Sequence, residues 1–283
     1  MKIREVRHLL TYDCNLRCKH CYLSAGEFSE AQMNFTSDTV DKFYSFFKPE
    51  IVSATGGEPL LFPDKTIMIA RSTALYGGQI EIVTNGILLS EKLANMILEA
   101  NPNTFFQISL DGLERYHNYL RNDTRAFKLA LRAIKIASTL GVLVKVRLTA
   151  TDQNFEQITG VINVLDSLES PNIRLVIRPV LSAGRALKND LKITHDLSEF
   201  DKFNYLSNAI KVETTDNSGK CGCGVDTITI DPFGDIYPCT YFVNMKEYRM
   251  GNIYQGFETL SENEEFKQFK GGCYARDLRK VSI

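Results

Sequence analysis

Three of the chain's seven cysteines fall within eight residues, in the stretch Cys14-Asn15-Leu16-Arg17-Cys18-Lys19-His20-Cys21. The spacing is C-x3-C-x2-C, and the stretch follows a predicted first strand. Cysteine thiolates are the usual ligands of iron–sulfur clusters, so three of them can bind three irons of a [4Fe–4S] cube. The fourth iron would have no protein ligand nearby, and such an iron can bind and activate a substrate or cofactor.

The alternative for these cysteines is a zinc site or a set of unrelated core thiols. Structural zinc sites commonly use four ligands arranged as two closely spaced pairs. Here three cysteines form one run, and the next cysteine in the chain is Cys221. The sequence therefore favours a cluster over zinc at Cys14, Cys18 and Cys21.

Length and composition narrow the class of protein further. With 283 residues and a net charge of −1, the chain lacks the basic excess of a dedicated nucleic-acid binder. No apolar run reaches the ~18 residues that a membrane span needs, and the charged residues 1–7 do not resemble a signal peptide. We therefore expect a cytoplasmic protein with no nucleic-acid or membrane partner, whose cysteines are metal ligands or redox groups.

Apolar strand-like segments alternate with helical patterns through the first two thirds of the sequence. We predict strands over residues 4–12, 51–55, 79–84, 104–110, 142–149 and 172–180, and helices over 36–48, 64–76, 90–100, 124–140 and 153–169. This alternation indicates a parallel sheet covered by helices. A partial TIM-type (β/α)6 barrel and an open doubly wound sheet both satisfy the pattern.

The partial barrel is the α/β fold that we expect. In a barrel, chemistry gathers at the carboxyl ends of the strands. Polar or glycine-containing segments follow the predicted strand ends throughout: the cysteine stretch, Gly56-Gly57-Glu58, Asn85, Asp111 and the Arg178-Pro179 turn. They would therefore lie together on one rim.

The pattern changes after residue 185. We predict a helix over 196–210, a polar hinge over 213–220, a β-hairpin with strands 225–230 and 235–239, and a short helix over 262–270. The predicted organisation is a partial barrel over residues 1–190. It is followed over 191–283 by a linker helix and a small β-hairpin/helix iron–sulfur module.

The segment from Thr11 to Tyr22 closely resembles the cluster loop of radical S-adenosylmethionine (radical SAM) enzymes. Gly56-Gly57-Glu58-Pro59 follows it where that family has a motif that cradles the amino end of the SAM methionine. Alone, this motif is typical of a turn before a helix. Glycines let a backbone approach a ligand, and Glu58 could pair with an ammonium group. His20 stands where the family usually has an aromatic residue against the adenine.

Other rim residues match the family more loosely. The resemblance implies that Ser109 and Asp111 contact the SAM ribose or the substrate, and that Arg121 occupies a position where the family often has arginine. Arg147 lies on a strand with alternating polarity, so it is either a partner for the SAM carboxylate or an outward-facing surface residue. Arg178 is expected to line the substrate cavity.

The remaining four cysteines are Cys221, Cys223, Cys239 and Cys273. Four thiolates can bind zinc or a second cluster. Their surroundings resemble the auxiliary-cluster domain called SPASM, but the chain has no cysteine after Cys273. The resemblance therefore implies the shortened Twitch-like form with one auxiliary [4Fe–4S] cluster. Cys221 and Cys223 are both expected as ligands; alternatively, one is a free thiol that donates a hydrogen atom to a substrate radical.

The resemblance implies that the enzyme cleaves SAM reductively to a 5′-deoxyadenosyl radical, which abstracts a hydrogen atom from a substrate C–H bond. The favoured substrate is a peptide that is oxidised, crosslinked or epimerised. The alternatives are a dehydrogenase or epimerase of an aminosugar or cyclitol, and a non-catalytic metal-binding protein. The Gly56-Gly57-Glu58 motif argues against the last, because a metal module needs no SAM cradle.

Partners follow from the same hypothesis. Reductive cleavage needs an electron donor of the flavodoxin or ferredoxin type. Because the cysteine stretch begins at residue 14, we expect no leader-binding domain ahead of it. A separate leader-binding protein is then the expected partner for a leader-dependent peptide.

Overall fold

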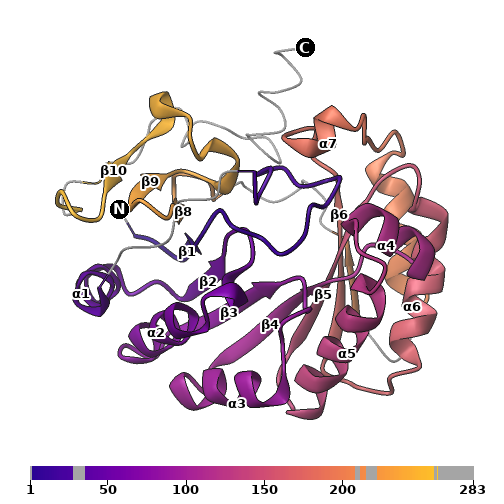
Figure 1. Cartoon of the computed structure of the whole chain (residues 1–283), viewed down its shortest axis with the longest axis horizontal. Helices are drawn as coiled ribbons and strands as arrows, with labels where there is room; N and C mark the ends of the chain where they lie inside the picture. The colour runs from indigo at the N-terminus through magenta and orange to yellow at the C-terminus, as the bar shows by residue number, and fades with distance from the viewer. Residues whose placement is uncertain (1, 28–35, 208–210, 215–221, 258–259, 261–283) are drawn as a thin grey trace.

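A single sheet organises the part of the chain that the structure describes. The structure is a computed structural model that describes residues 2–27, 36–207, 211–214, 222–257 and 260 (Figure 1). Ten strands in this part are hydrogen-bonded in the order β10-β9-β8-β1-β2-β3-β4-β5-β6-β7. The sheet ends at β10 and β7 and does not close, so the predicted partial barrel is confirmed.

Six parallel strands form the centre of this sheet, and they lie where the sequence predicts them. They are β1 (Glu5–Leu9), β2 (Ile51–Thr55), β3 (Gln79–Thr84), β4 (Thr104–Ser109), β5 (Val144–Ala150) and β6 (Ile173–Pro179). Each is a short run rich in β-branched or other apolar residues, which favours a strand buried on one or both faces.

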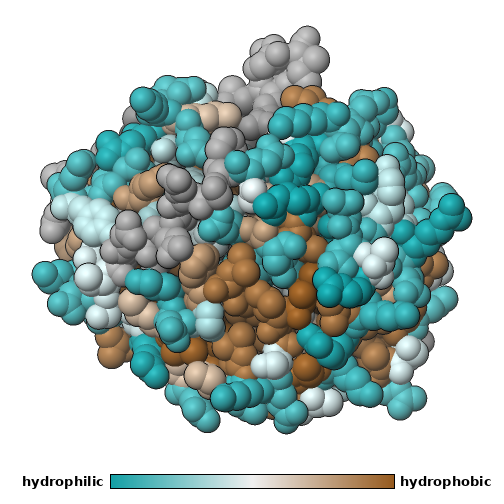
Figure 2. Space-filling view, viewed as in Figure 1, coloured by the Kyte–Doolittle hydropathy of each residue, from teal (hydrophilic) through white to brown (hydrophobic). Residues whose placement is uncertain are grey.

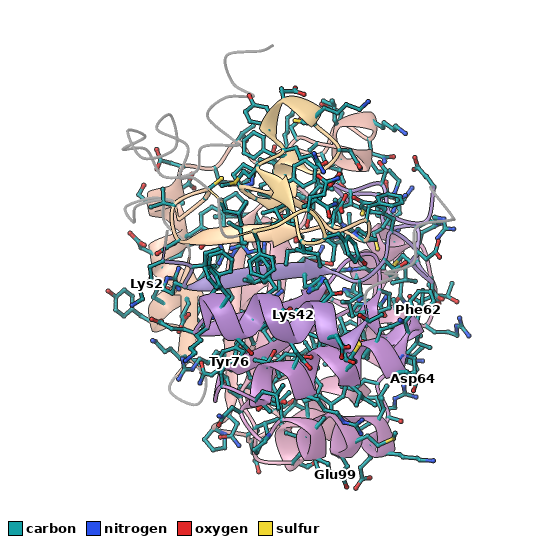
Figure 3. The ribbon with its side chains drawn as sticks, turned by 90° about the vertical axis from the view of Figure 1, so that its left-hand side faces the viewer. Lys2, Lys42, Phe62, Asp64, Tyr76 and Glu99 are labelled. Atoms are coloured by element: carbon teal, nitrogen blue, oxygen red, sulfur yellow. The ribbon has the colours of Figure 1, made fainter. Side chains whose placement is uncertain are left out.

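Helices cover the outer face of the sheet. They are α1 (Ser37–Phe47), α2 (Pro63–Ala74), α3 (Glu91–Ala100), α5 (Ala126–Thr139) and α6 (Ile158–Asp166), all close to prediction. Figure 3 shows α1, α2 and α3 side by side, with Lys42, Asp64 and Glu99 marking each in turn. Strand β5 shows how the faces divide: Val144, Val146 and Leu148 are fully buried in the core beneath the helices.

The sequence prediction is incomplete for the helices and strands that consist mostly of polar residues. Helix α4 (Glu114–Arg121) and the short α7 (Arg185–Lys188) were not predicted, and the predicted helix over 196–210 is a 3-10 helix, Leu197–Tyr205. The hinge predicted over 213–220 is wrong for its first two residues. Strand β7 (Lys211–Thr214) pairs in parallel with β6 at the edge of the sheet, and its Val212 is buried. A short edge strand can be largely polar, so its sequence resembles that of a turn.

The predicted hairpin is confirmed, and it has an unexpected neighbour. Strands β8 (Thr227–Ile230) and β9 (Asp235–Tyr237) pair antiparallel, and the two-residue β10 (Gly251–Asn252) follows β9. Strand β8 also pairs in parallel with β1, so the hairpin extends the sheet of the barrel. The helix predicted over 262–270 lies outside the described residues.

One face of the molecule carries a hydrophobic area. Hydrophobic side chains gather on the face shown in Figure 2, in front of β3, β4 and β5, within a mostly hydrophilic surround. Across the described ranges, we find no helix with both the length and the apolar character that crossing a membrane requires.

Truncation of a buried and of an exposed apolar side chain should change the free energy of unfolding by very different amounts. Phe106 on β4 is fully buried, whereas Leu75 after α2 is 68% exposed. Phe106→Ala should lower the free energy of unfolding by about 3–5 kcal/mol, because it removes contacts and leaves a cavity. Leu75→Ala should change it by no more than about 0.5 kcal/mol. Urea denaturation measures both, and equal losses would show that the core does not extend to β4.

Candidate active site

The cysteine stretch follows β1 and crosses the carboxyl ends of the parallel strands. Its first residues are held by the segment that follows β2. The amide of Gly57 donates to the Thr11 carbonyl at 2.8 Å, and the amide of Glu58 donates to the Asp13 carbonyl at 2.8 Å. Backbone hydrogen bonds thus join the cysteine stretch to the Gly56-Gly57-Glu58 motif, about 45 residues later in the chain, as one backbone-paired unit.

The two glycines are required by this pairing. Gly56 has φ +137°, and a Cβ there would lie 2.5 Å from the Thr11 carbonyl oxygen. A Cβ at Gly57 would lie closer still to the Asp13 carbonyl oxygen. We expected these glycines to let the backbone approach a ligand. The close approach in the structure is to the cysteine stretch itself, which no larger residue would permit.

Glu58 lies inside the protein, with 1% of its surface exposed. Its carboxylate accepts hydrogen bonds from the Leu60 amide at 3.1 Å, the Thr84 hydroxyl at 2.7 Å and the Asn85 amide at 2.8 Å. Burial raises the pKa of Glu58 to about 7, although these donors oppose the shift. The Asn85 side chain in turn donates to Asn15 in the cysteine stretch. Glu58 therefore joins the ends of β2 and β3 to the stretch, and a SAM ammonium group would have to share it with internal donors.

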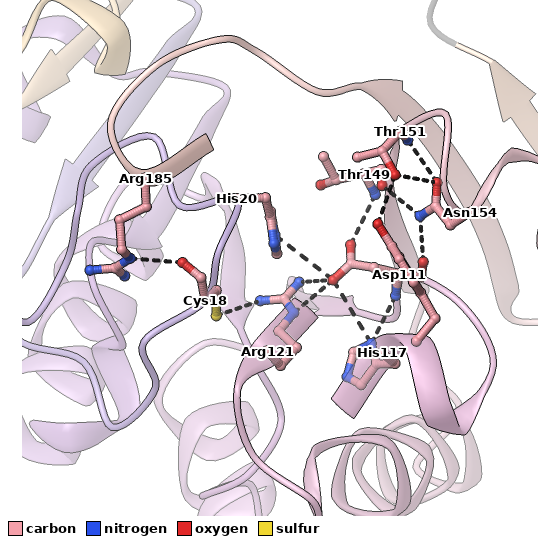
Figure 4. Close-up of polar contacts among 10 residues, drawn as sticks. Cys18, His20, Asp111, His117, Arg121, Thr149, Thr151, Asn154 and Arg185 are labelled. Carbon is pink, nitrogen blue, oxygen red and sulfur yellow. Dashed lines mark hydrogen bonds and ion pairs between the residues drawn. The ribbon is translucent and has the colours of Figure 1, made fainter. Parts of the chain in front are cut away.

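Asp111 and Arg121 form a buried ion pair beneath the cysteine stretch (Figure 4). The Arg121 Nε and Nη2 atoms donate to Asp111 Oδ2 at 2.7 and 2.6 Å. The Thr149 amide donates to Asp111 Oδ1 at 2.9 Å, and Arg121 Nη1 lies 3.7 Å from the Cys18 sulfur. Burial alone would raise the pKa of Asp111, but Arg121, the two neighbouring histidines and the Thr149 amide together hold that pKa below its ordinary value. The pair thus connects the end of β4 to a predicted cluster ligand.

Two histidines flank this pair. His20 Nε2 lies 3.8 Å from Asp111 Oδ2, and its other ring nitrogen is buried without a hydrogen-bond partner. Burial lowers the pKa of His20 to about 4, so the ring is neutral at pH 7. His117 Nδ1 accepts a hydrogen bond from the Asp111 amide at 2.9 Å. His20 therefore presents a neutral ring with one unused nitrogen, which suits contact with a heterocycle.

The interior face of the sheet, opposite the helices, carries the remaining predicted residues. Arg147 is on β5, between Lys145 and Thr149, and its strand register places it beside Ser109 on β4. Since Val146 and Leu148 point into the core beneath the helices, the outward-facing alternative for Arg147 is wrong. Arg178 on β6 is in register with Thr149 and shares this interior face.

Arg185 is a functional residue that the sequence prediction missed. Its Nε donates to the Cys18 carbonyl at 2.7 Å, and its Nη1 donates to the Ala25 carbonyl and to Glu27, both at 3.0 Å. Gly184 before it has φ +54° and lies against the backbone of Tyr22. The signal in the sequence is Gly184-Arg185-Ala186, a glycine and an arginine that closely follow the sixth predicted strand.

The sulfur atoms of the stretch can be tested for their fit to a cluster. Cys14, Cys18 and Cys21 are all free thiols. The Leu16 amide donates to the Cys14 sulfur at 3.4 Å, and the Ala25 amide donates to the Cys21 sulfur at 3.4 Å. Hydrogen bonds of this kind stabilise and tune cluster thiolates.

The same sulfurs are not arranged for one metal ion. Within the residues that the structure describes, no three Cys, His, Asp or Glu side chains form a site for a single ion. A cubane cluster gives each cysteine its own iron, so its ligands need not converge on one point. The donor set therefore fits a [4Fe–4S] cluster better than zinc.

The C-terminal cysteines are described in part. Cys223 and Cys239 are buried in one small cluster with Phe242. A hydrogen bond with Cys223 lowers the pKa of Cys239 to about 7, although burial opposes it. Cys221 and Cys273 lie outside the described residues. The structure thus brings together two of the four predicted auxiliary ligands.

Comparison with known families decides the class of protein. The model of the radical SAM superfamily matches residues 9–165, and that of the SPASM iron–sulfur cluster-binding domain matches residues 221–281. The chain belongs to the radical SAM superfamily. It is accordingly an enzyme that uses SAM and a [4Fe–4S] cluster, and its C-terminal part is an auxiliary-cluster domain. That this radical SAM enzyme has a single auxiliary cluster stays a prediction.

Curated radical SAM relatives resemble nearly the whole chain. The mycofactocin maturase MftC of Mycobacterium tuberculosis is 29% identical, over 90% of this chain and 69% of its own length. The antilisterial bacteriocin subtilosin biosynthesis protein AlbA of Bacillus subtilis is 25% identical, over 95% and 66%. The Fe-coproporphyrin III synthase of Methanosarcina barkeri is 27% identical, over 95% and 65%. The chain thus spans roughly two thirds of the length of these relatives.

A solved radical SAM structure supports the fold. SuiB of Streptococcus suis, crystallised with SAM, superposes with a TM-score of 0.76 at 16% identity, covering 98% of this chain and 74% of that one. At this identity the likeness concerns the fold, and it agrees with the partial barrel and its appended module.

Gly57 offers a direct test of the backbone-paired unit. Gly57→Ala should displace the cysteine stretch, because the new Cβ would overlap the Asp13 carbonyl, and iron per chain should fall from about eight to about four. Gly160→Ala in α6 is the matched control: its Cβ would meet only the side chain of Leu113, at 3.2 Å. Normal iron content in Gly57→Ala would contradict the pairing.

The ion pair beneath the stretch makes a second prediction. Arg121→Gln should lower the free energy of unfolding by about 3–5 kcal/mol, because Asp111 is left charged and buried without its partner. The Arg121→Gln/Asp111→Asn double variant should recover at least half of that loss. Anaerobic urea denaturation measures both, and a double variant as unstable as the single one would show that the two residues are not coupled.

Proposed function

We propose that this radical SAM enzyme modifies a peptide, by oxidation, crosslinking or epimerisation at a C–H bond. The observation that carries the proposal is the cysteine stretch, whose three free thiols leave one iron of a cluster open for SAM. The peptide is supported by likeness to AlbA, a bacteriocin biosynthesis protein, over 95% of the chain.

The cluster and SAM together supply a 5′-deoxyadenosyl radical that can abstract a hydrogen atom from carbon. The residues of the chain hold and orient the reactants. Cys14, Cys18 and Cys21 would hold the cluster, and Arg185 fixes their loop through its carbonyl groups. The interior face of the sheet, which carries polar side chains on β5 and β6, would receive the substrate.

The contacts to SAM are proposals of the same kind. His20, with its unused ring nitrogen, would lie against the adenine. Gly56, Gly57 and Pro59 would border the methionine. Ser109, on the interior face next to Arg147, would reach the ribose. Asp111 is fully engaged by Arg121 and Thr149, so we assign it to holding the site and not to direct contact with SAM.

The organisation and partners are proposed as the sequence suggests. Residues 1–190 would form the SAM-cleaving domain and residues 191–283 the auxiliary-cluster module, although β7 and β8 join the sheet of the first. The enzyme would work in a reducing cytoplasm with a flavodoxin- or ferredoxin-type donor and, for a leader-dependent peptide, a separate leader-binding protein.

A tetrapyrrole is the second candidate substrate. The observation in its favour is the likeness to Fe-coproporphyrin III synthase, which covers 95% of the chain. Both candidates need the same radical, so they differ only in what the interior face of the sheet must bind.

Anaerobic reconstitution tests the proposed function. With dithionite and SAM, the enzyme should form 5′-deoxyadenosine, and Cys18→Ala should abolish it because the cluster loses a ligand. Iron should be about eight per chain, falling to about four in Cys18→Ala. Absence of 5′-deoxyadenosine from the wild-type enzyme with full iron would refute the proposal.

Iron content also tests the role of Cys223 in the auxiliary-cluster module. If Cys223 is a cluster ligand, Cys223→Ala should also reduce iron from about eight to about four per chain. If iron stays at about eight while product formation is lost, Cys223 acts as a hydrogen-atom donor instead.

A further inference from the structure

On strands β1, β5 and β6, four partly buried cationic side chains lie on the interior face of the sheet. They are Arg7 on β1, Lys145 and Arg147 on β5, and Arg178 on β6. Each alternates with core residues along its strand, so each points away from the helices. Cations on the interior of a sheet are costly unless they are paired or bind something.

Two of the four are paired. Arg7 Nε donates to Glu5 on the same strand at 2.8 Å. Lys145 Nζ lies 3.4 Å from Glu81 on β3, whose carboxylate also accepts from Ser53 at 2.6 Å. The acidic groups on this part of the face are thus engaged by Arg7 and Lys145.

The other two, Arg147 and Arg178, have no such partner. Neither guanidinium makes a hydrogen bond or an ion pair with any side chain in the described ranges, and Arg178 Nε is buried without a partner. Thr149 pairs with Arg178 in the strand register, so Arg147 and Arg178 are diagonal neighbours on adjacent strands. Burial, Arg147 and Arg7 together lower the pKa of Arg178 to about 10.

Arg147 lies nearer than Arg178 to the predicted contacts of SAM. The charge of Arg147 acts on His20 of the cysteine stretch, so Arg147 lies at the SAM side. The charged or titratable neighbours of Arg178 are Arg147, Arg7, Tyr241, Glu81 and Glu5, and none belongs to the cysteine stretch. The two carboxylates among them already pair with Lys145 and Arg7. The charge of Arg7 in turn acts on Cys239, so the same interior face extends toward the auxiliary cysteines.

We propose that Arg147 and Arg178 form a subsite that binds one carboxylate group of the substrate. Two neighbouring guanidinium groups without an acidic partner are complementary to a carboxylate, which can accept planar, bidentate hydrogen bonds. The anion relieves the repulsion between them and fixes the substrate on this interior face. The inference rests on the proposed function and adds to it that the substrate is acidic.

Four holoenzymes test the subsite: the wild type, Arg178→Gln, Arg178→Lys and the control Arg174→Gln. Arg174 is on the same strand and face, but at its opposite end, 3.7 Å from Glu213. Removal of an unpaired charge should not destabilise the fold, so Arg178→Gln should melt no lower than Arg174→Gln. A lower melting temperature for Arg178→Gln would show that Arg178 is engaged within the protein.

The probes are two randomised heptapeptide libraries. One contains Asp and Glu and has a free C-terminal carboxylate; the other has Asn and Gln in their place and a C-terminal amide. SAM-loaded wild type and Arg174→Gln should retain the acidic library about tenfold more than the amide library, a difference of about 1.4 kcal/mol. Arg178→Gln should reduce that ratio to about one, and Arg178→Lys should restore part of it. Equal retention by the wild type, or an unchanged ratio in Arg178→Gln, would overturn the proposal for peptides.

Two further arms identify the source of the carboxylate. If Arg147→Gln and Arg178→Gln raise the SAM concentration for half-maximal cleavage by about tenfold, with the library ratio unchanged, the arginines bind SAM and the proposal is wrong. Coproporphyrin III and its methyl ester replace the libraries in the last arm. In one outcome, the wild type binds coproporphyrin III more tightly than its methyl ester, loses that preference in Arg178→Gln, and retains both libraries equally. That result would support the subsite and refute the peptide function.

Discussion

The buried ion pair between Asp111 and Arg121 is the constraint on which the geometry of the site depends. It lies where the ends of β4 and β5 meet the cysteine stretch. Asp111 accepts a hydrogen bond from a backbone amide of β5, Arg121 reaches the sulfur of Cys18, and two histidines lie beside the pair. A carboxylate that is wholly removed from water must keep its partner, because an unpaired buried charge is far more costly than a broken surface contact. Arg121 therefore cannot move without Asp111, and Cys18 is held within reach of both. The loop that carries the predicted cluster ligands owes its position to this pair and to the backbone pairing with Gly57.

The sequence predicted those features that follow from local patterns. Each of the six central strands is a short apolar run, and each was placed within two residues of its observed bounds, apart from the first, which is shorter than expected. The cysteine spacing and the Gly56-Gly57-Glu58 motif identified the family, which the family models confirm. The alternating polarity of β5 predicted that Arg147 lies on one of the two faces of the sheet. Because Val146 and Leu148 are buried beneath the helices, Arg147 lies on the interior face.

What could not be predicted depends on contacts between residues far apart in the chain. The glycines of the motif were expected to admit a ligand, but they admit the backbone of Thr11 and Asp13. Glu58 is charged and was expected to face SAM, yet three donors from the ends of β2 and β3 surround it. Helix α4 was missed because most of its residues are polar, and its three buried ones include Arg121, whose burial only a partner can explain.

The pairing of β8 with β1 has a consequence for how the chain is made. The amide of Arg4, just before β1, donates a hydrogen bond to the carbonyl of Asp226, 222 residues later. During synthesis, the first strand therefore has an open edge until β8 (Thr227–Ile230) has left the ribosome. Contacts of such long range form slowly, and an unpaired edge invites association with other strands. Because the cysteine stretch follows β1 directly, the predicted cluster ligands adjoin a strand whose edge stays unpaired until residues 227–230 have been synthesised.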